Sequence, residues 1–409
     1  MIAHTLISSH VAKGSRPSPS ETKGDSPHRR SEGRKTYLVA GVPPRSKRRS
    51  RGPAPTVIDL FSGIGAGSLG FQRAGYRIVG AVDIDRAASR VYERNFHVTP
   101  IVGDLRKIEG GQILEKFGLE KGEVDVCVGC PPCQAFSSLR STTIKRGQRD
   151  RRKSLVSVYA DRISEILPKV VVLENVSGLA RGRNRRYLLK FLLRMKRLGY
   201  RCSYDILQSA DYGAPQLRKR LVLIGVRTGD PTMPQRTHEA EANASGQMPW
   251  RTVRDAISDL PRLRHGERSK ADSLHASSDH RESVMNIIRN IPKDGGDRFD
   301  LPRELWLPCH RRIENEGGPH NRSGRNVYGR MKWDSPAPTI TTRSVTPAGG
   351  RFVHPDQDRG LTLRESARLQ TIPDDFLIEG KKTQLSTWIG NAMPTNLAEA
   401  IAVHVLRYT

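Results

Sequence analysis

Short apolar runs alternate with amphipathic segments over the first 230 residues. Runs rich in Val, Ile and Leu are typical of buried strands, and they occur at "TVIDLF", "RIVGAVDID", "PIVGD", "EVDVCVGC", "VVVLENV" and "RLVLIGV". Helical patterns lie between them at "RAASRVYERNF", "SLVSVYADRISEIL" and "YLLKFLLRMKRLG". Another helix is expected after "TVIDLF", running to about Arg73 and stopped by Gly75. This alternation predicts an α/β, Rossmann-like fold with a mostly parallel, doubly wound sheet.

The alternation of strand and helix patterns stops between about residues 230 and 350. That segment is rich in Arg, His, Gly and Pro, and "TVRDAISDL" is its clearest helical pattern. Helical patterns return in "TLRESARLQ" and "NLAEAIAVHVLR". We therefore expect an α/β catalytic domain over 55–229, completed by 376–409, with a smaller domain and hinge inserted over 230–375.

A glycine-rich turn follows the first predicted strand directly. Gly65, Gly67 and Gly70 have the G-x-G-x-x-G spacing that lets backbone N–H groups and a helix N-terminus approach an adenosine-bearing ligand. Asp83 ends the second strand, where its carboxylate can accept from both ribose hydroxyls, and Asp104 ends the third, placed to accept from an adenine amino group. NAD, FAD and S-adenosylmethionine sites all fit this pattern, and so does a tight turn without a ligand.

Three cysteines, Cys127, Cys130 and Cys133, follow the fourth predicted strand with C-x2-C-x2-C spacing. An iron–sulfur cluster is disfavoured, because no fourth cysteine follows closely and two prolines stiffen the loop. Cys127 lies inside an apolar run, where cysteine behaves as a small hydrophobic residue. The remaining interpretation is one exposed thiol, Cys133, at the ligand-binding edge of the sheet. The basic loop "SSLRSTTIKRGQRDRRK" after it would favour the thiolate.

The charge points to a polyanionic partner. The net charge is +27, which gathers nucleic acid most commonly among soluble polyanions. Residues 1–52 hold 12 Lys or Arg against three Asp or Glu and show little apolar periodicity, so we expect a basic disordered tail over 1–54. The tail either helps to hold DNA or is a solvated extension. No apolar run approaches the length of a membrane span.

Six segments, in order, resemble the DNA cytosine-5 methyltransferase family of bacterial restriction–modification systems. They are "DLFSGIGAGSLGFQRAG", "PPCQAFS", "ENV", "QLRKR", "LTLRESARLQTIPD" and "GNAMPTN". One such match could arise by chance, but six in the family's order hardly could. The resemblance implies the fold of S-adenosylmethionine-dependent methyltransferases and makes the inserted segment a target-recognition domain.

The resemblance also assigns catalytic roles. Cys133 matches the nucleophile that attacks C6 of cytosine, and Glu174 matches the glutamate that contacts N3 and the exocyclic amine. Arg220 matches the arginine that contacts O2, with Arg218 and Gln216 supporting it or the loop. Arg218 and Arg220 are two apart on an extended segment, so both guanidinium groups are expected to point toward one site.

The implied cofactor is S-adenosyl-L-methionine, and the implied substrate is a cytosine swung out of double-stranded DNA. The basic loop after Cys133 would close over the DNA. Ile84 would pack on adenine and Asn391 would line the same pocket. The residues expected to bind the cofactor are Phe61, Gly63, Gly65, Asp83, Ile84, Asp104 and Asn391.

The inserted segment contains side chains suited to reading base edges. Arg and Asn side chains in "HNRSGRNVYGR" could read guanine or adenine edges. A zinc site from Cys309, His310 and His320 is conceivable, but its spacing fits no common pattern, so we expect no metal.

Two other functions are compatible with parts of the sequence. One is a tRNA cytosine-5 methyltransferase with the same core; its characteristic Cys-Phe-Thr segment is not evident here. The other is a non-enzymatic nucleic-acid binder, which the presence of Cys133, Glu174 and Arg220 disfavours. We expect a monomeric, cytoplasmic and nucleoid-associated enzyme, accompanied by a restriction endonuclease that acts on the same sequence.

Overall fold

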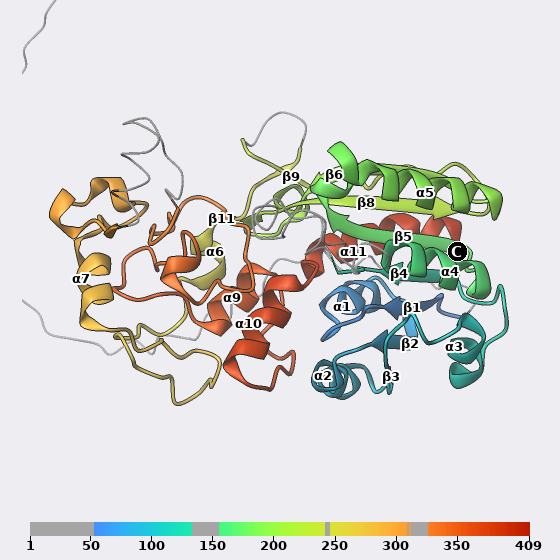
Figure 1. Ribbon diagram of the computed structural model, residues 1–409, viewed down its shortest axis with the longest axis horizontal. Helices are drawn as coiled ribbons and strands as arrows, with labels where there is room; N and C mark the ends of the chain where they lie inside the picture. Colours follow the sequence, from blue (N-terminus) through green and yellow to red (C-terminus); the bar gives the residue numbers. More distant parts are fainter. Residues whose placement is uncertain (1–52, 133–154, 242–245, 309–310, 312–325) are drawn as a thin grey trace, which may run out of the picture. The chain divides into compact units, whose positions relative to one another are not determined.

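A computed structural model describes residues 53–132, 155–241, 246–308, 311 and 326–409. Contacts divide the chain into residues 1–48 and 49–409, and every described residue belongs to the second unit. Its centre is a seven-stranded sheet with the order β3-β2-β1-β4-β5-β8-β6 (Figure 1). The strands are β1 (Thr56–Leu60), β2 (Arg77–Asp83), β3 (Ile101–Val102), β4 (Val126–Gly129), β5 (Val170–Val176), β6 (Arg201–Gln208) and β8 (Lys219–Val226).

Neighbours among β1 to β5 pair in parallel, whereas β8 is antiparallel to both β5 and β6. The prediction of an α/β fold with a mostly parallel sheet is confirmed. The sequence prediction omitted β6, because this edge strand is of mixed polarity and several of its side chains are exposed. Since a short connection leads from β6 to β8, β8 enters the sheet in the opposite direction.

Helices pack on both faces of the sheet (Figure 1). Strand β5 shows the division: Val170 and Val172 join one core with residues of α1, α2 and α11, whereas Val171 and Leu173 join another with residues of α3, α4 and α5. This alternation is the period-two pattern of a strand covered on both faces. The helices are α1 (Ala66–Arg73), α2 (Arg86–Phe96), α3 (Gly110–Phe117), α4 (Leu155–Ile166), α5 (Arg185–Arg197) and α11 (Thr395–Val405).

Residues 216–217 and 230–391 add short elements. Two pairs of two-residue strands form parallel ladders, β7 (Gln216–Leu217) with β11 (Ala337–Pro338), and β9 (His238–Glu239) with β10 (Met248–Pro249). A third apolar core gathers around Met285, Ile288, Trp306 and Val353. The helices are α6 (Val253–Ile257), α7 (Glu282–Asn290), α9 (Leu363–Leu369) and α10 (Lys382–Asn391). Within the described residues, no helix is long and apolar enough to cross a bilayer.

Single-turn 3₁₀ helices connect many of these elements. They are η4 (Ser177–Ala180), η5 (Gly182–Asn184), η6 (Ser209–Tyr212), η7 (Arg298–Asp300), η8 (Arg303–Leu305), η9 (Pro347–Gly349) and η10 (Leu406–Tyr408). Two of them, η4 and η5, link the end of β5 to the start of α5.

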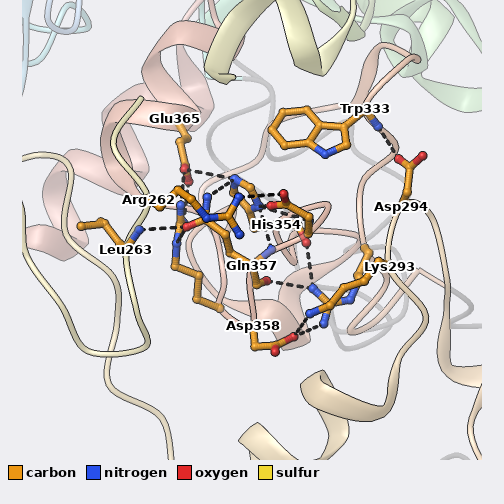
Figure 2. Close-up of polar contacts among 12 residues, drawn as sticks. Arg262, Leu263, Lys293, Asp294, Trp333, His354, Gln357, Asp358 and Glu365 are labelled. Carbon is orange, nitrogen blue, oxygen red and sulfur yellow. Dashed lines mark hydrogen bonds and ion pairs between the residues drawn. The ribbon is translucent and has the colours of Figure 1, made fainter. Parts of the chain in front are cut away.

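A polar network joins Lys293 to the segment that leads into α9 (Figure 2). Arg359 donates to both carboxylate oxygens of Glu365, at 2.9 and 2.6 Å. Arg330 is fully buried and donates to the carbonyls of Ile288 and Ile291, among others. Arg330 is the last residue of "HNRSGRNVYGR", the segment predicted to read base edges. For this residue the prediction is wrong, because its guanidinium is buried and hydrogen-bonded inside the protein. The arginines at 322 and 325 lie outside the described residues.

Candidate active site

A cavity of about 450 Å³ lies where β1, β2 and β4 end, beside Glu174 of β5. Several of its lining residues come from α10 and the segment after it. The C-terminal part of the chain therefore forms one wall of the cavity, and the ends of the N-terminal strands form another. Nine of the predicted site residues line it: Phe61, Gly63, Asp83, Ile84, Asp104, Glu174, Arg218, Arg220 and Asn391. The cavity therefore brings together residues predicted from segments more than 300 positions apart.

The turn after β1 is fixed against the end of β2. The Gly63 N–H donates to Oδ2 of Asp83 at 2.7 Å, and the Asp85 N–H donates to Oδ1 at 2.8 Å. Burial raises the pKa of Asp83 above its ordinary value. The two N–H groups hold the carboxylate in one orientation, with its remaining lone pairs available to hydroxyl donors from a ligand.

Two glycines of the G-x-G-x-x-G spacing serve packing. Gly65 precedes α1 with a φ of +92°, and a Cβ there would lie 2.3 Å from the Phe96 ring. At Gly70, a Cβ would lie 2.5 Å from the Glu399 nitrogen and 2.7 Å from the Thr395 carbonyl oxygen, so glycine lets α1 approach α11. Gly67, between them, lines the cavity.

Two predicted adenosine contacts occupy different environments. Ile84 is 67% exposed although it lines the cavity, so it offers an apolar surface for a flat ring. Asp104 lies two residues beyond β3 rather than at its end, and its carboxylate accepts from the Arg106 guanidinium, with both oxygens 2.9 Å from Nε. Arg106 lowers the pKa of Asp104 through this hydrogen bond. A ligand amine would therefore share Asp104 with Arg106.

The wall from α10 includes residues that the sequence analysis missed. Asn391 lines the cavity as predicted, and Trp388 lines it as well. The Trp388 Nε1–H donates to Oδ2 of Asp85 at 2.8 Å, while Oδ1 of Asp85 accepts from the N-terminal N–H groups of α2. An aspartate directly before a helical pattern is a capping signal, and it could have identified Asp85. Trp388 had no comparable signal.

A second missed residue lies under the turn. Asp59 of β1 lines the cavity and accepts from the Ser68 hydroxyl at 2.5 Å, which in turn contacts the Tyr92 hydroxyl at 2.8 Å. Burial raises the pKa of Asp59 to about 7. This chain of three polar groups fastens α1 and α2 to β1 below the glycine-rich turn.

Glu174 and Arg220 form an ion pair inside the cavity. Their side chains are 9% and 11% exposed, and Nε of Arg220 lies 2.9 Å from Oε1 of Glu174. Strands β5 and β8 are antiparallel neighbours with Val176 opposite Arg220, so the two residues lie diagonally across the ladder. One carboxylate and one guanidinium side by side can accept from an amine and donate to a carbonyl of a planar base.

Arg218 does not share this arrangement. Although it lines the cavity, it is 2% exposed and donates to the carbonyls of Ile340, Gly390 and Ala392 at 2.7–3.0 Å. Gln216 likewise donates to the Leu369 carbonyl at 2.7 Å. The expectation that both arginines point toward one site is wrong for Arg218, because its guanidinium joins the start of β8 to the C-terminal segment.

Cys133 lies outside the described residues, as do the basic loop that follows it and the residues 309, 310 and 320 of the conceivable zinc site. The two residues before Cys133 are described. Pro131 and Pro132 line the cavity, and the buried Asn175 donates from Nδ2 to the Pro131 carbonyl at 2.9 Å. Cys127 is fully buried in β4, and burial raises its pKa, which confirms its interpretation as a small hydrophobic residue. In the part of the chain that the structure covers, no cluster of His, Cys, Asp or Glu could hold a metal ion.

Comparisons with known proteins converge on one family. Residues 55–407 match the family model described as C-5 cytosine-specific DNA methylase. The Type II methylase M.HgiDII of Herpetosiphon aurantiacus is 34% identical, over 86% of this chain and 95% of that protein. The Type II methyltransferase M1.HphI of Haemophilus parahaemolyticus is also 34% identical, over 86% of this chain and 87% of that protein.

Solved structures support the fold. The Entamoeba histolytica methyltransferase EhMeth aligns with a TM-score of 0.56 at 15% identity, over 87% of this chain and 99% of that one. A prophage-encoded protein of E. coli aligns with a TM-score of 0.63 at 22% identity, over 87% of this chain and 99% of that one.

Proposed function

This chain belongs to the C-5 cytosine-specific DNA methylase family, and on that premise we propose that it methylates C5 of one cytosine within a specific duplex DNA sequence, using S-adenosyl-L-methionine. One observation carries the proposal. A single cavity is lined both by the residues expected to bind the cofactor, such as Asp83 and Ile84, and by the Glu174–Arg220 pair expected to bind the base.

The cavity suits an adenosine-bearing cofactor. Asp83 presents a fixed carboxylate for ribose hydroxyls, and Ile84 presents an exposed apolar surface for adenine. Gly63 and Phe61 form the turn that the ligand would approach, and Asn391 faces it from α10. When bound there, S-adenosyl-L-methionine would supply an electrophilic methyl group to C5 of the cytosine.

The base would be held by the ion pair. Arg220 would donate to O2, while Glu174 would accept from the exocyclic amine and, when protonated, donate to N3. Such hydrogen bonds make the ring a better electrophile, so that the Cys133 thiolate can add to C6. After methylation, loss of the C5 proton lets the thiolate leave. Arg218 and Gln216 are positioning residues, because they hold the start of β8 against the C-terminal segment.

A base inside a stacked duplex cannot reach this cavity, so the cytosine must be flipped out. We assign closure over the DNA to the basic loop 137–153, and sequence recognition to the inserted domain within 230–375. Because relatives at 34% identity are named Type II methyltransferases, we also propose that a restriction endonuclease acting on the same sequence accompanies the enzyme.

The test is transfer of a labelled methyl group. Purified protein is incubated with S-adenosyl-L-[methyl-³H]methionine and either duplex DNA or tRNA, and bisulfite sequencing then locates the modified cytosine. We expect label in DNA and none in tRNA, with no label for Cys133→Ser. Label in tRNA alone would overturn the proposal in favour of the tRNA enzyme, and label in neither would favour a non-enzymatic binder.

A further inference from the structure

Four exposed arginines lie within one six-residue stretch, 181–186, that follows β5. They are Arg181, Arg183, Arg185 and Arg186, and the stretch 177–197 that contains them has eight Lys or Arg and no Asp or Glu. Among the residues that the structure describes, none of the four forms an ion pair. Arg186 donates from Nη2 to the Tyr187 hydroxyl at 3.2 Å, and its guanidinium lies 5.0 Å from the centre of the Tyr187 ring. The four guanidinium groups are therefore exposed and have no carboxylate partner among the described residues.

The backbone that carries these arginines is held in place. Leu179 of η4 is fully buried in the core beneath α4 and α5. The Asn184 side chain donates to the Gly178 carbonyl at 3.3 Å, and the Asn184 N–H donates to the Arg181 carbonyl at 3.2 Å. Gly182 has a φ of +50°, which favours glycine. These contacts form a defined turn that presents arginines, so we name residues 181–186 the arginine turn.

The charge works against the local secondary structure. Arg185 and Arg186 are the first two residues of α5, where the helix dipole is positive, and α5 has no acid in its first turn and no side-chain cap. Cations at this end destabilise an isolated helix. An anion bound beside them would reverse this penalty by pairing with the guanidinium groups near the positive end of the helix dipole.

The position of the arginine turn indicates which anion. Glu174 lies in the cavity, and η4 begins only three residues later, at the end of β5 where a flipped base would enter. The strand that carries that base has a phosphate on either side of every nucleotide, so phosphates must pass over this edge. Residues 177–186 themselves expose no large apolar side chain of the kind that anchors protein interfaces, and the exposed Leu189 and Leu193 lie further along α5.

We propose that the arginine turn binds backbone phosphates of the DNA duplex next to the flipped nucleotide, independently of base sequence. The proposal rests on the proposed function, since it takes the substrate to be DNA. Guanidinium groups suit this role because their planar fork can donate two hydrogen bonds to one phosphate. The turn would thus position the duplex while the inserted domain reads its sequence.

The test measures binding to a 40-base-pair duplex of mixed sequence by fluorescence anisotropy over a range of salt concentrations. Loss of each phosphate contact lowers the slope of log affinity against log salt by about 0.9, so Arg181→Gln/Arg183→Gln should lower it by about 2 and weaken binding on the order of 10-fold at low salt. The matched control is Lys196→Gln/Arg197→Gln, which removes two exposed charges from the C-terminal end of α5. It should keep the slope close to that of wild type.

A second variant guards against misfolding. Arg185→Glu/Arg186→Glu should hold or raise the melting temperature, because acids suit a helix N-terminus, while DNA affinity falls. A wild-type salt slope in both arginine-turn variants would overturn the inference and leave an acidic protein as the better partner. Methyl transfer separates the two proposals: a wild-type protein that binds DNA through these arginines but methylates none would refute the proposed function alone.

Discussion

Arg220 reaches across the antiparallel ladder between β8 and β5 and places its Nε 2.9 Å from the Glu174 carboxylate, with both side chains about one-tenth exposed. The pair lies in the cavity shared with the glycine-rich turn. Each charge is satisfied by the other without DNA, so the site can stay folded with no base present. On the proposed function, base binding would exchange this internal ion pair for contacts to the ring.

Glu174→Gln keeps the size of the side chain and removes its charge. We expect methyl transfer to fall by about 100-fold or more, because the amide, unlike a carboxylic acid, cannot transfer a proton to N3. The unpaired guanidinium of Arg220 should lower the free energy of unfolding on the order of 1–3 kcal/mol. Initial rates and urea unfolding measure the two effects, with Glu115→Gln on the exposed face of α3 as control. Unchanged rates would exclude Glu174 from the chemistry.

Asn175 should act through the Pro-Pro turn. Its Nδ2 donates to the Pro131 carbonyl at 2.9 Å in a fully buried setting, two residues before Cys133. Asn175→Ala leaves that carbonyl without its donor, so we expect a loss of about 1–3 kcal/mol in stability and a lower kcat. Affinity for S-adenosyl-L-methionine, measured by calorimetry without DNA, should change little. A variant with normal kcat would show that the turn needs no such tether.

Asp83 should decide cofactor affinity. In Asp83→Asn, an amide N–H₂ would replace one of the two oxygens that accept from Gly63 and Asp85, so the turn would lose its orientation. We expect the Kd for S-adenosyl-L-methionine to rise by about 10- to 100-fold, which corresponds to roughly 1.4–2.8 kcal/mol. Isothermal titration calorimetry without DNA measures this directly, and an unaltered Kd would place the ribose elsewhere.

Gly70 tests the packing of α1 against α11. A methyl group there would meet backbone atoms of Glu399 and Thr395 at 2.5 and 2.7 Å, which cannot move aside as a flexible side chain could. Gly70→Ala should therefore destabilise the protein by about 1–3 kcal/mol, despite the better helix propensity of alanine. Gly111→Ala in α3 is the matched control, because nothing lies within 4 Å of its Cβ position. Equal melting temperatures for both variants would contradict the close helix packing.

His354 makes stability depend on pH. Burial lowers the pKa of His354 to about 4 from 6.5, so between these values the unfolded chain binds a proton that the native state does not. The contribution of His354 to stability is therefore full above about pH 6.5 and falls by roughly 3 kcal/mol as the pH drops toward 4, whereas the raised pKa of Asp59 changes stability in the opposite direction over this range. Urea unfolding across this range should show a smaller fall for His354→Gln, which cannot titrate. The same fall in both proteins would assign the effect to other groups.

The strands that build the cavity could be predicted because each is a short apolar run followed at once by glycines or acids, as at Asp83. Long-range geometry could not. Arg218 and Arg220 stand two apart on one extended segment, yet only Arg220 meets Glu174, since the guanidinium of Arg218 is bound by carbonyls such as those of Ile340 and Gly390. No local pattern specifies those distant acceptors.

Trp388 shows the same limit. Its part in the cavity depends on a hydrogen bond to Asp85, which lies 303 positions earlier in the chain. The third apolar core was likewise not predicted, because its residues, such as Met285 and Val353, are scattered through a segment that is rich in polar residues. Short motifs could be assigned a chemical role from the sequence, but the contacts between residues of distant motifs could be found only in the structure.

The covalent step is tested most directly with a suicide substrate. Duplex DNA carrying 5-fluorocytosine at the target position is incubated with S-adenosyl-L-methionine and the protein, and the product is digested and analysed by mass spectrometry. We predict a denaturation-resistant adduct on the peptide that contains Cys133, because fluorine at C5 cannot leave as a proton does, and no adduct for Cys133→Ser. Two results would contradict nucleophilic attack by Cys133. One is wild-type protein without an adduct on 5-fluorocytosine DNA, when the protein methylates the same position in unmodified DNA; the other is an equal adduct yield from Cys133→Ser.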